Sequence, residues 1–311
     1  MRRACAFVAA VTALSGMALH GQVVFRSNAD EVLVDVSVMR GRSPVTGLSA
    51  ADFVVTDNGV RQAIRDVRTN SGDIDVTLVI QREAVLSTLL TDTQGQFAGI
   101  RSQAAESSID AANVQVRRLI QPADALRILT ADGEVMLGAE PQPRSGRSSI
   151  LDGLTAAMML KPTAVGRRQL IIGLTGGTDD RSFVPERSRL NVALRTDTVV
   201  HIVALGSGML SYLLPNGERG GVRYGVGVAA APLKPIAEAT GGRLYQVDPG
   251  ANVEKMLGPA LEEFRTRYLL RYVPTGVARD GWHDIVVTVP SGSFEIRHRR
   301  GYEVTKPRPA V

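Results

Sequence analysis

Cysteine is almost absent from this sequence, since Cys5 is the only one among 311 residues. Cys5 lies in the first apolar stretch, so the remainder of the chain can form no disulfide and holds no thiolate nucleophile. A chain of this length can bury an adequate hydrophobic core without disulfides. The single cysteine therefore excludes thiol chemistry but does not exclude an oxidising compartment.

Lysine and histidine are also scarce, which excludes several kinds of catalytic site. None of the four lysines follows a glycine, as a phosphate-binding loop requires. The histidines beyond the N-terminal stretch are His201, His283 and His298, which are far apart and form no HExxH motif, so we expect no histidine zinc site. We expect His201, in an apolar run, to be a hydrogen-bonded core residue. The GxSxG elbow of serine hydrolases is absent as well.

Two other segments carry weak ligand signals. Residues 225–230 fit the GxGxxA dinucleotide pattern, but a glycine-rich segment precedes them, and Pro232 and Pro235 delay the next helix. Residues 297–300 are basic, yet no second basic cluster with interleaved aromatics accompanies them. A charged strand edge that deters aggregation explains this run better than nucleic-acid binding does. We expect neither a dinucleotide nor a nucleic-acid ligand.

The N-terminus has the three parts of a secretory signal peptide. Residues 1–3 are basic at two positions, residues 4–19 carry no charge and are mostly apolar, and small and polar residues follow. Thr12, Ser15 and Gly16 interrupt the apolar stretch, which is shorter than the ~20 residues that a membrane span needs. We expect cleavage near Gly21, a secreted or periplasmic protein, and no membrane span after cleavage.

The next segment, residues 22–70, has the pattern of β-structure. Valines alternate with polar residues over 31–40, which is typical of a half-buried strand. Asp57, Asn58 and Gly59 follow a second apolar run and predict a hairpin turn.

From about residue 71 the pattern changes to alternating strands and helices. The expected strands are 75–80, 125–129, 134–137, 169–174, 199–205 and 244–247, and the expected helices are 97–120, 149–160, 187–196, 235–240 and 252–266. We expect Pro259 to kink or divide the last helix, and we interpret residues 207–228 as an inserted surface loop. The alternation predicts an α/β fold, a doubly wound and mainly parallel sheet with helices on both faces.

After residue 266 the chain returns to short strands separated by Pro-Thr-Gly and Pro-Ser-Gly turns. The two β-segments, 22–70 and 267–311, are each too short to fold alone. We therefore expect them to pair into one discontinuous β-sandwich, with the α/β domain of residues 71–266 inserted between them.

Polar loops follow three of the expected strands, at the edge where open parallel sheets bind ligands. These loops are residues 81–85, 145–149 and 175–180. The candidate ligand-binding residues within them are Gln81, Arg82, Glu83, Ser148, Gly176, Thr178 and Asp179.

Over most of its length the sequence resembles the von Willebrand factor A domain, in the variant common in acidobacterial secreted proteins. The motifs that carry the resemblance are Val45-Thr46-Gly47-Leu48, Asp57-Asn58-Gly59, Asp75-Val76-Thr77-Leu78-Val79, Ser149-Ile150-Leu151-Asp152-Gly153-Leu154, Leu174-Thr175-Gly176-Gly177, Tyr268-Leu269-Leu270-Arg271-Tyr272 and Arg299-Arg300-Gly301-Tyr302. The resemblance implies a protein-interaction module whose binding edge holds a divalent cation through an Asp-x-Ser-x-Ser loop, a Thr and a distant Asp.

Most of these metal-ligand positions have lost their chemistry in this sequence. The first Asp position holds Gln81, the two Ser positions hold Glu83 and Val85, the Thr position holds Ser148, and the distal Asp position holds Gly176. Mg²⁺ is normally held by one or two carboxylates, and Arg82 adds like-charge repulsion on the order of a kcal/mol or more. We therefore expect no standard metal site and no cofactor. If Mg²⁺ or Ca²⁺ does bind, the substitute ligands are Glu83, Ser148 and Asp179. For Asp179 we favour a solvated loop position or a cap for the following helix.

The leading hypothesis is an exported, non-enzymatic protein-interaction module that needs no metal. In that case the Arg82 guanidinium could receive an acidic side chain of the partner directly. One alternative is a metal-dependent adhesin with substitute ligands. Another is an enzyme that uses a nucleotide or an unrecognised pair of carboxylates.

Overall fold

The computed structural model describes residues 31–69, 72–81, 103–132, 134–138, 148–176, 179, 181–205, 208–213, 219–224, 231–247 and 253–304. The predicted signal peptide 1–21, the dinucleotide-like segment 225–230, and Arg82, Glu83, Val85 and Thr178 lie outside these residues. Among the helices of the described ranges, none is long and apolar enough to span a membrane.

A six-stranded sheet forms the centre of the α/β part, in the order β13-β10-β9-β6-β7-β8. Five strands are parallel, and the short edge strand β8 runs antiparallel to β7. Their bounds are β6 Ile74–Ile80, β7 Ala125–Ala131, β8 Val135–Leu137, β9 Arg168–Thr175, β10 Val199–Leu205 and β13 Leu244–Val247. Every residue of β6 and β10 is buried, as expected for strands covered on both faces. The predicted α/β class with a mainly parallel sheet is confirmed.

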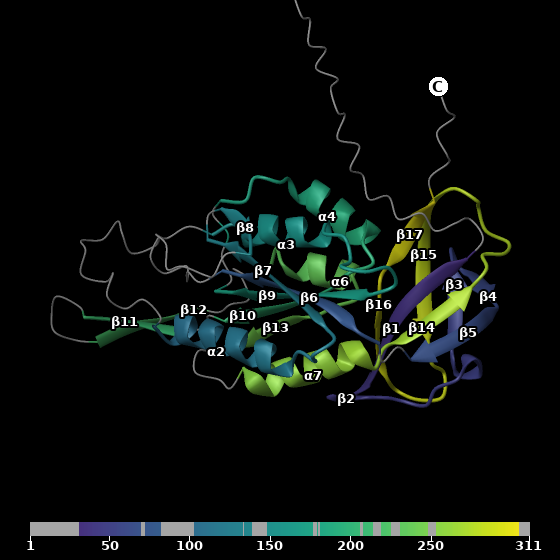
Figure 1. Cartoon of the computed structure of the whole chain (residues 1–311), viewed down its shortest axis with the longest axis horizontal. Coiled ribbons are helices and arrows are strands. Elements are labelled where there is room, and N and C mark those ends of the chain that lie inside the picture. Colours follow the sequence, from purple (N-terminus) through teal and green to yellow (C-terminus); the bar gives the residue numbers. More distant parts are fainter. Residues whose placement is uncertain are drawn as a thin grey trace, which may run out of the picture.

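Helices cover both faces of this sheet (Figure 1). One face carries α3 (Ile150–Met158), α4 (Glu186–Arg195) and α6 (Lys234–Ala239), and the other carries α2 (Gln103–Leu119) and α7 (Glu254–Arg265). Neighbouring residues of one strand alternate between the two cores, so Ile171 packs with the first group and Leu170 with the second.

Two features of the α/β part differ from the expectation. Pro259 does not divide α7, which is one helix from Glu254 to Arg265, and Leu257, Leu261 and Phe264 pack it against the sheet on both sides of the proline. The expected inserted surface loop, residues 207–228, contains an antiparallel strand pair, β11 (Gly208–Leu213) and β12 (Arg219–Tyr224). The signal for this hairpin was the Asn-Gly pair at residues 216–217 between the two strands.

Two smaller sheets each combine strands from both ends of the chain. One has the order β16-β1-β14-β5, with the short β2 beside β1, and the other has the order β17-β15-β3-β4. The strands are β1 Val32–Arg40, β2 Ser43–Pro44, β3 Val54–Asp57, β4 Val60–Gln62, β5 Ile64–Thr69, β14 Tyr268–Tyr272, β15 Gly281–Thr288, β16 Glu295–His298 and β17 Gly301–Val304, and the 3-10 helix η1 is Ala50–Asp52. The predicted hairpin after β3 is present, because Asp57 pairs with Val60, and Asn58 and Gly59 both have positive φ.

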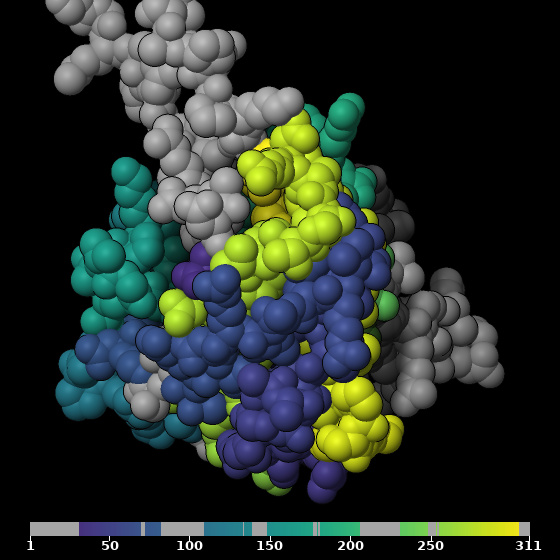
Figure 2. Space-filling view, turned by 90° about the vertical axis from the view of Figure 1, so that its right-hand side faces the viewer, coloured from purple at the N-terminus to yellow at the C-terminus, as the bar shows by residue number. Residues whose placement is uncertain are grey.

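The two small sheets share one apolar core, to which Val34, Phe53, Tyr268, Val287 and Tyr302 contribute. Figure 2 shows this end of the molecule, where purple-blue N-terminal residues and yellow C-terminal residues lie side by side. A polar cluster is buried in the same layer. The carboxylate of Asp57 accepts hydrogen bonds from the hydroxyls of Tyr272 (2.9 Å) and Tyr302 (2.7 Å), and its other oxygen lies 2.7 Å from Nδ1 of His283. These contacts satisfy a carboxylate that is fully buried.

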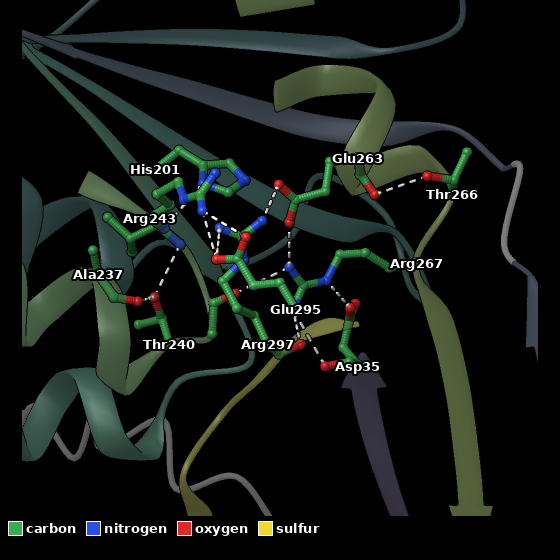
Figure 3. Close-up of polar contacts among 12 residues, drawn as sticks. Asp35, His201, Ala237, Thr240, Arg243, Glu263, Thr266, Arg267, Glu295 and Arg297 are labelled. Carbon is green, nitrogen blue, oxygen red and sulfur yellow. Dashed lines mark hydrogen bonds and ion pairs between the residues drawn. The ribbon is translucent and has the colours of Figure 1, made fainter. Parts of the chain in front are cut away.

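Charged side chains join the small sheets to the amino end of the six-stranded sheet (Figure 3). Asp35 of β1 accepts hydrogen bonds from Nε (2.9 Å) and Nη2 (2.6 Å) of Arg168 and also from Arg267. Arg267 is fully buried and donates to Glu263 of α7 and to the carbonyl of Gly241. Burial raises the pKa of Asp35, but the two guanidinium groups outweigh this effect and hold it below its usual range. The carboxyl edge of the six-stranded sheet therefore points away from the small sheets.

Candidate functional site

The carboxyl edge of the six-stranded sheet brings two of the predicted positions together. Strand β6 pairs with β9, with Ile80 opposite Leu174, so the residues that follow them are neighbours. The N–H of Gln81 donates to the carbonyl of Leu174 at 2.8 Å, and the hydroxyl of Thr175 donates to Oε1 of Gln81. Gln81, Thr175 and Gly176 are buried. Gln81 is therefore hydrogen-bonded to the end of β9 through both its backbone and its side chain.

Ser148 lies at the same edge but beside a different strand. The N–H of Ser149 donates to the carbonyl of Ala131 at 2.9 Å, which places the start of α3 at the carboxyl end of β7. The carbonyl of Ser148 accepts the N–H of Arg181 at 2.8 Å, so the loop after β9 returns to this point. Both serines are buried. This contact brings Ser148 close to the segment that holds Asp179.

Asp179 is a helix cap, although not for the helix that the sequence suggested. One carboxylate oxygen accepts hydrogen bonds from the N–H of Leu151 (2.8 Å) and the hydroxyl of Ser182 (2.7 Å). The other oxygen accepts the N–H of Ser182 at 2.9 Å. Leu151 lies in the first turn of α3, so Asp179 satisfies the preceding helix and not the following one, α4. An aspartate in a loop gives no sign of which helix it will cap.

Asp152 forms further hydrogen bonds between α3 and the same loop. Its carboxylate accepts the backbone N–H groups of Phe183 (2.9 Å) and Val184 (3.1 Å), and its own N–H donates to Ser182. These bonds fix residues 182–184 against α3, yet the side chain of Phe183 is 85% exposed. Sequence reasoning missed Asp152 and Phe183. The available signals were an acidic residue in the first turn of a helix and a lone aromatic residue in a polar segment.

Exposed apolar residues of β8 lie beside this edge. Strand β8 begins opposite the last residue of β7, and its three residues Val135, Met136 and Leu137 are all exposed. The β11–β12 hairpin follows the carboxyl end of β10 and projects beyond the sheet (Figure 1). The edge thus combines hydrogen-bonded polar groups with exposed apolar side chains at Phe183 and on β8.

Comparison with solved structures gives distant matches. BatB from Bacteroides thetaiotaomicron is 12% identical, with 61% of this chain and 98% of that chain covered and a TM-score of 0.40. The SpRpn10 VWA domain is 13% identical, with 60% and 94% covered and a TM-score of 0.35. A von Willebrand factor type A protein from Catenulispora acidiphila is 10% identical, with 89% and 76% covered and a TM-score of 0.38. The chain is similar to von Willebrand A domains.

The description of the fold rests on the strand pairings themselves. No family profile matches the sequence, and a search of curated proteins gave no match.

The described residues do not fit the cation site of a von Willebrand A domain. Asp179 is the one acidic side chain among the predicted positions that the structure describes, and three protein donors already occupy its two oxygens. Nowhere in the described ranges do three His, Cys, Asp or Glu side chains gather in a way that could hold a metal ion. A hard cation would have to displace bonds that hold α3 and its neighbouring loop in place.

His201, His283 and His298 lie on three different strands, β10, β15 and β16. As expected, His201 is a hydrogen-bonded core residue: it is fully buried, and its Nδ1 accepts the N–H of Arg243 at 3.1 Å.

Proposed function

We propose that this protein is a non-enzymatic interaction module that binds a partner protein at the carboxyl edge of its six-stranded sheet without a metal ion. The observation that carries the proposal is Phe183, a large aromatic side chain that is 85% exposed while its backbone is fixed by Asp152. Rigidly held, exposed aromatic side chains are the typical anchors of protein interfaces, because they add apolar area at low entropic cost. The exposed residues of β8 extend the apolar surface at the same edge.

Metal independence is supported by the internal bonding of the polar groups. The Gln81–Thr175 and Asp179–Ser182 hydrogen bonds leave this edge organised without a cation. Partner recognition would then rest on apolar contact, and we keep the hypothesis from the sequence that Arg82 receives an acidic side chain of the partner.

We also infer that residues 1–21 direct export, so that the partner is met in the periplasm or outside the cell. In addition, we infer that residues 22–70 and 267–311 act as one discontinuous β-sandwich that carries the inserted α/β part. The pairing of β1 with β14 and β16 and the shared apolar core support this organisation. N-terminal sequencing of the native protein should begin near Gln22, and an intact Met1 on cytosolic protein would contradict export.

The interaction itself is tested by partner capture from the native envelope fraction. Phe183→Asp should reduce capture by about thirtyfold, the loss expected for one interface anchor. Val165→Asp is the matched control, since Val165 is a fully exposed apolar residue in the loop whose Thr163 binds Asp75 at the amino end of β6. Capture should also be unchanged by EDTA. Equal capture by wild type and Phe183→Asp would contradict the proposed binding edge, and loss with EDTA alone would contradict metal independence.

A further inference from the structure

Strand β8 is the outermost strand on its side of the six-stranded sheet, among the strands that the structure describes. Its three residues are apolar and exposed, Val135 by 37%, Met136 by 41% and Leu137 by 60%. Sheet edges in natural proteins are usually protected by charge, proline, a bulge or a cover. The edge strands of the small sheets follow this rule, since β4 contains Arg61 and β17 contains Glu303. Strand β8 has no charge, proline or bulge within its bounds.

The pairing of β8 with β7 determines which backbone groups of β8 point outward. The N–H of Gly138 donates to the carbonyl of Ile128 at 2.8 Å, and these two residues stand opposite each other when the register of the pair is continued. In an antiparallel ladder, hydrogen-bonded pairs alternate with pairs that exchange no hydrogen bonds. The backbone of Met136 is therefore bonded to β7, whereas Val135 and Leu137 direct their N–H and C=O groups away from the sheet.

A strand with this pattern is complementary to a second copy of itself. Two strands related by a two-fold axis perpendicular to the sheet run antiparallel, and an axis at Met136 places Val135 of one copy opposite Leu137 of the other. Each of these two pairs can exchange two hydrogen bonds, so the outward groups of both strands are all used. The two Met136 residues then face each other across the axis in a pair without mutual hydrogen bonds.

The neighbouring residues and the register are compatible with this pairing. Glu134 is exposed and directly precedes β8, and it would stand opposite Gly138 of the second copy, which has no side chain. Like charges therefore do not meet, and Val135 and Leu137 form apolar cross-strand pairs. A shift of one residue would set Val135 or Leu137 opposite Met136, whose backbone groups already bond to β7. The hydrogen-bonding pattern thus excludes a one-residue shift.

We propose that two copies of this protein associate through β8, so that their six-stranded sheets join into one continuous sheet across a two-fold axis. The contact does not use Phe183 or Asp179, so it goes beyond the proposed function and does not depend on it. Because β8 has three residues, the main-chain bonds are few, and the dimer should be reversible and depend on protein concentration. The dimer would carry two copies of Phe183, which would strengthen the capture of a partner that has two binding sites.

A disulfide at position 136 tests the geometry of the pairing. Opposite residues in a pair without mutual hydrogen bonds have Cα atoms about 4.5 Å apart, a distance that a disulfide can span. In a Cys5→Ser background, Met136→Cys introduces the only cysteine of the chain, and mild oxidation should convert most of the protein to a covalent dimer. Leu33→Cys, at an exposed apolar residue of β1, is the matched control and should remain monomeric under the same conditions.

Sedimentation equilibrium of the wild-type protein, from about 1 μM to about 1 mM, should show a monomer–dimer equilibrium. Leu137→Pro should weaken dimerisation about tenfold or more, because it removes an outward N–H that makes no bond to β7. Met136→Lys should weaken it as well, because two positive charges would face each other across the axis. Val165→Lys, at an exposed apolar residue away from β8, should have no effect. Circular dichroism checks that each variant is folded.

Three results would overturn the proposal: a wild-type protein that stays monomeric up to about 1 mM, equal dimerisation of wild type and Met136→Lys, or equal cross-linking at positions 136 and 33. If Leu137→Pro unfolds, Met136→Lys and the cross-linking pair still decide. Partner capture by Phe183→Asp is measured separately, so failure of the dimer and failure of the proposed binding edge are distinguished.

Discussion

At the scale of single residues, Asp179 matters most to the proposed function, because the residue considered as a substitute metal ligand is bonded to the protein itself. Its two oxygens are used by Leu151 and Ser182, which hold the loop after β9 against the start of α3. Phe183 follows directly and is kept exposed by the same arrangement. One short segment, residues 179–183, therefore both caps α3 and exposes Phe183.

Asp179→Ala should lower the free energy of unfolding by about 1–2 kcal/mol, since the start of α3 loses its cap and the loop loses its anchor. Urea denaturation measures this change. Asp284→Ala is a control that removes an exposed aspartate bonded to the indole of Trp282, and it should cost less. An Asp179→Ala variant as stable as the wild type would show that the cap contributes nothing.

His201 predicts a particular pH dependence of stability. Burial lowers its pKa to about 4, with Arg267, Arg297 and Arg243 adding to this effect and Glu263 opposing it. In the unfolded chain the pKa is about 6.5, so between these values the unfolded state binds a proton that the folded state does not. The free energy of unfolding should therefore fall as pH falls, by about 2 kcal/mol from about pH 7 to about pH 5.

The His201→Gln variant isolates this contribution, because the remaining groups titrate in both proteins. Denaturant unfolding at several pH values should give a shallower slope for the variant between about pH 7 and about pH 5. Equal slopes would mean that His201 is not held neutral by burial.

At the scale of elements, the sequence predicted the strands of the central sheet well and the polar contacts poorly. Val199–Leu205 and Leu244–Val247 occur with the expected bounds, because continuous apolar runs between turn signals have few alternative structures. The role of Asp179 could not be predicted, because a cap depends on which loop returns to which helix. The hydrogen bond between Gln81 and Thr175 likewise joins residues that are 94 positions apart in sequence, and it depends on β6 pairing with β9.

The N-terminal strands should need the C-terminal strands in order to stay folded. Removing residues 270–311 takes away β15, β16 and β17 and most of β14, and exposes Val34, Phe53 and Val55. The truncated protein should aggregate or lose residues 31–69 to protease, which size-exclusion chromatography and limited proteolysis detect. A monomeric truncation that resists protease would show that the two β-segments are independent.

At the scale of the whole molecule, the two small sheets and the proposed binding edge lie at opposite ends of the six-stranded sheet. The small sheets meet the amino end of the six-stranded sheet through Asp35, Arg168 and Arg267. The carboxyl edge is left at the opposite end, where β8 and the β11–β12 hairpin lie (Figure 1). Phe183 is held at this edge by Asp152 of α3. A partner could therefore reach this edge without disturbing the contact between the two parts.

The hydrogen bonds of the carboxyl edge should close it to a cation. Calorimetric titration of EDTA-treated protein with Mg²⁺, Mn²⁺ and Ca²⁺ tests it most directly. We predict no saturable binding heat and no change in melting temperature with any of the three ions. A stoichiometric heat that disappears in an Asp179→Asn variant, but persists in an Asp284→Asn control, would contradict the account and show that a metal site is retained with substitute ligands.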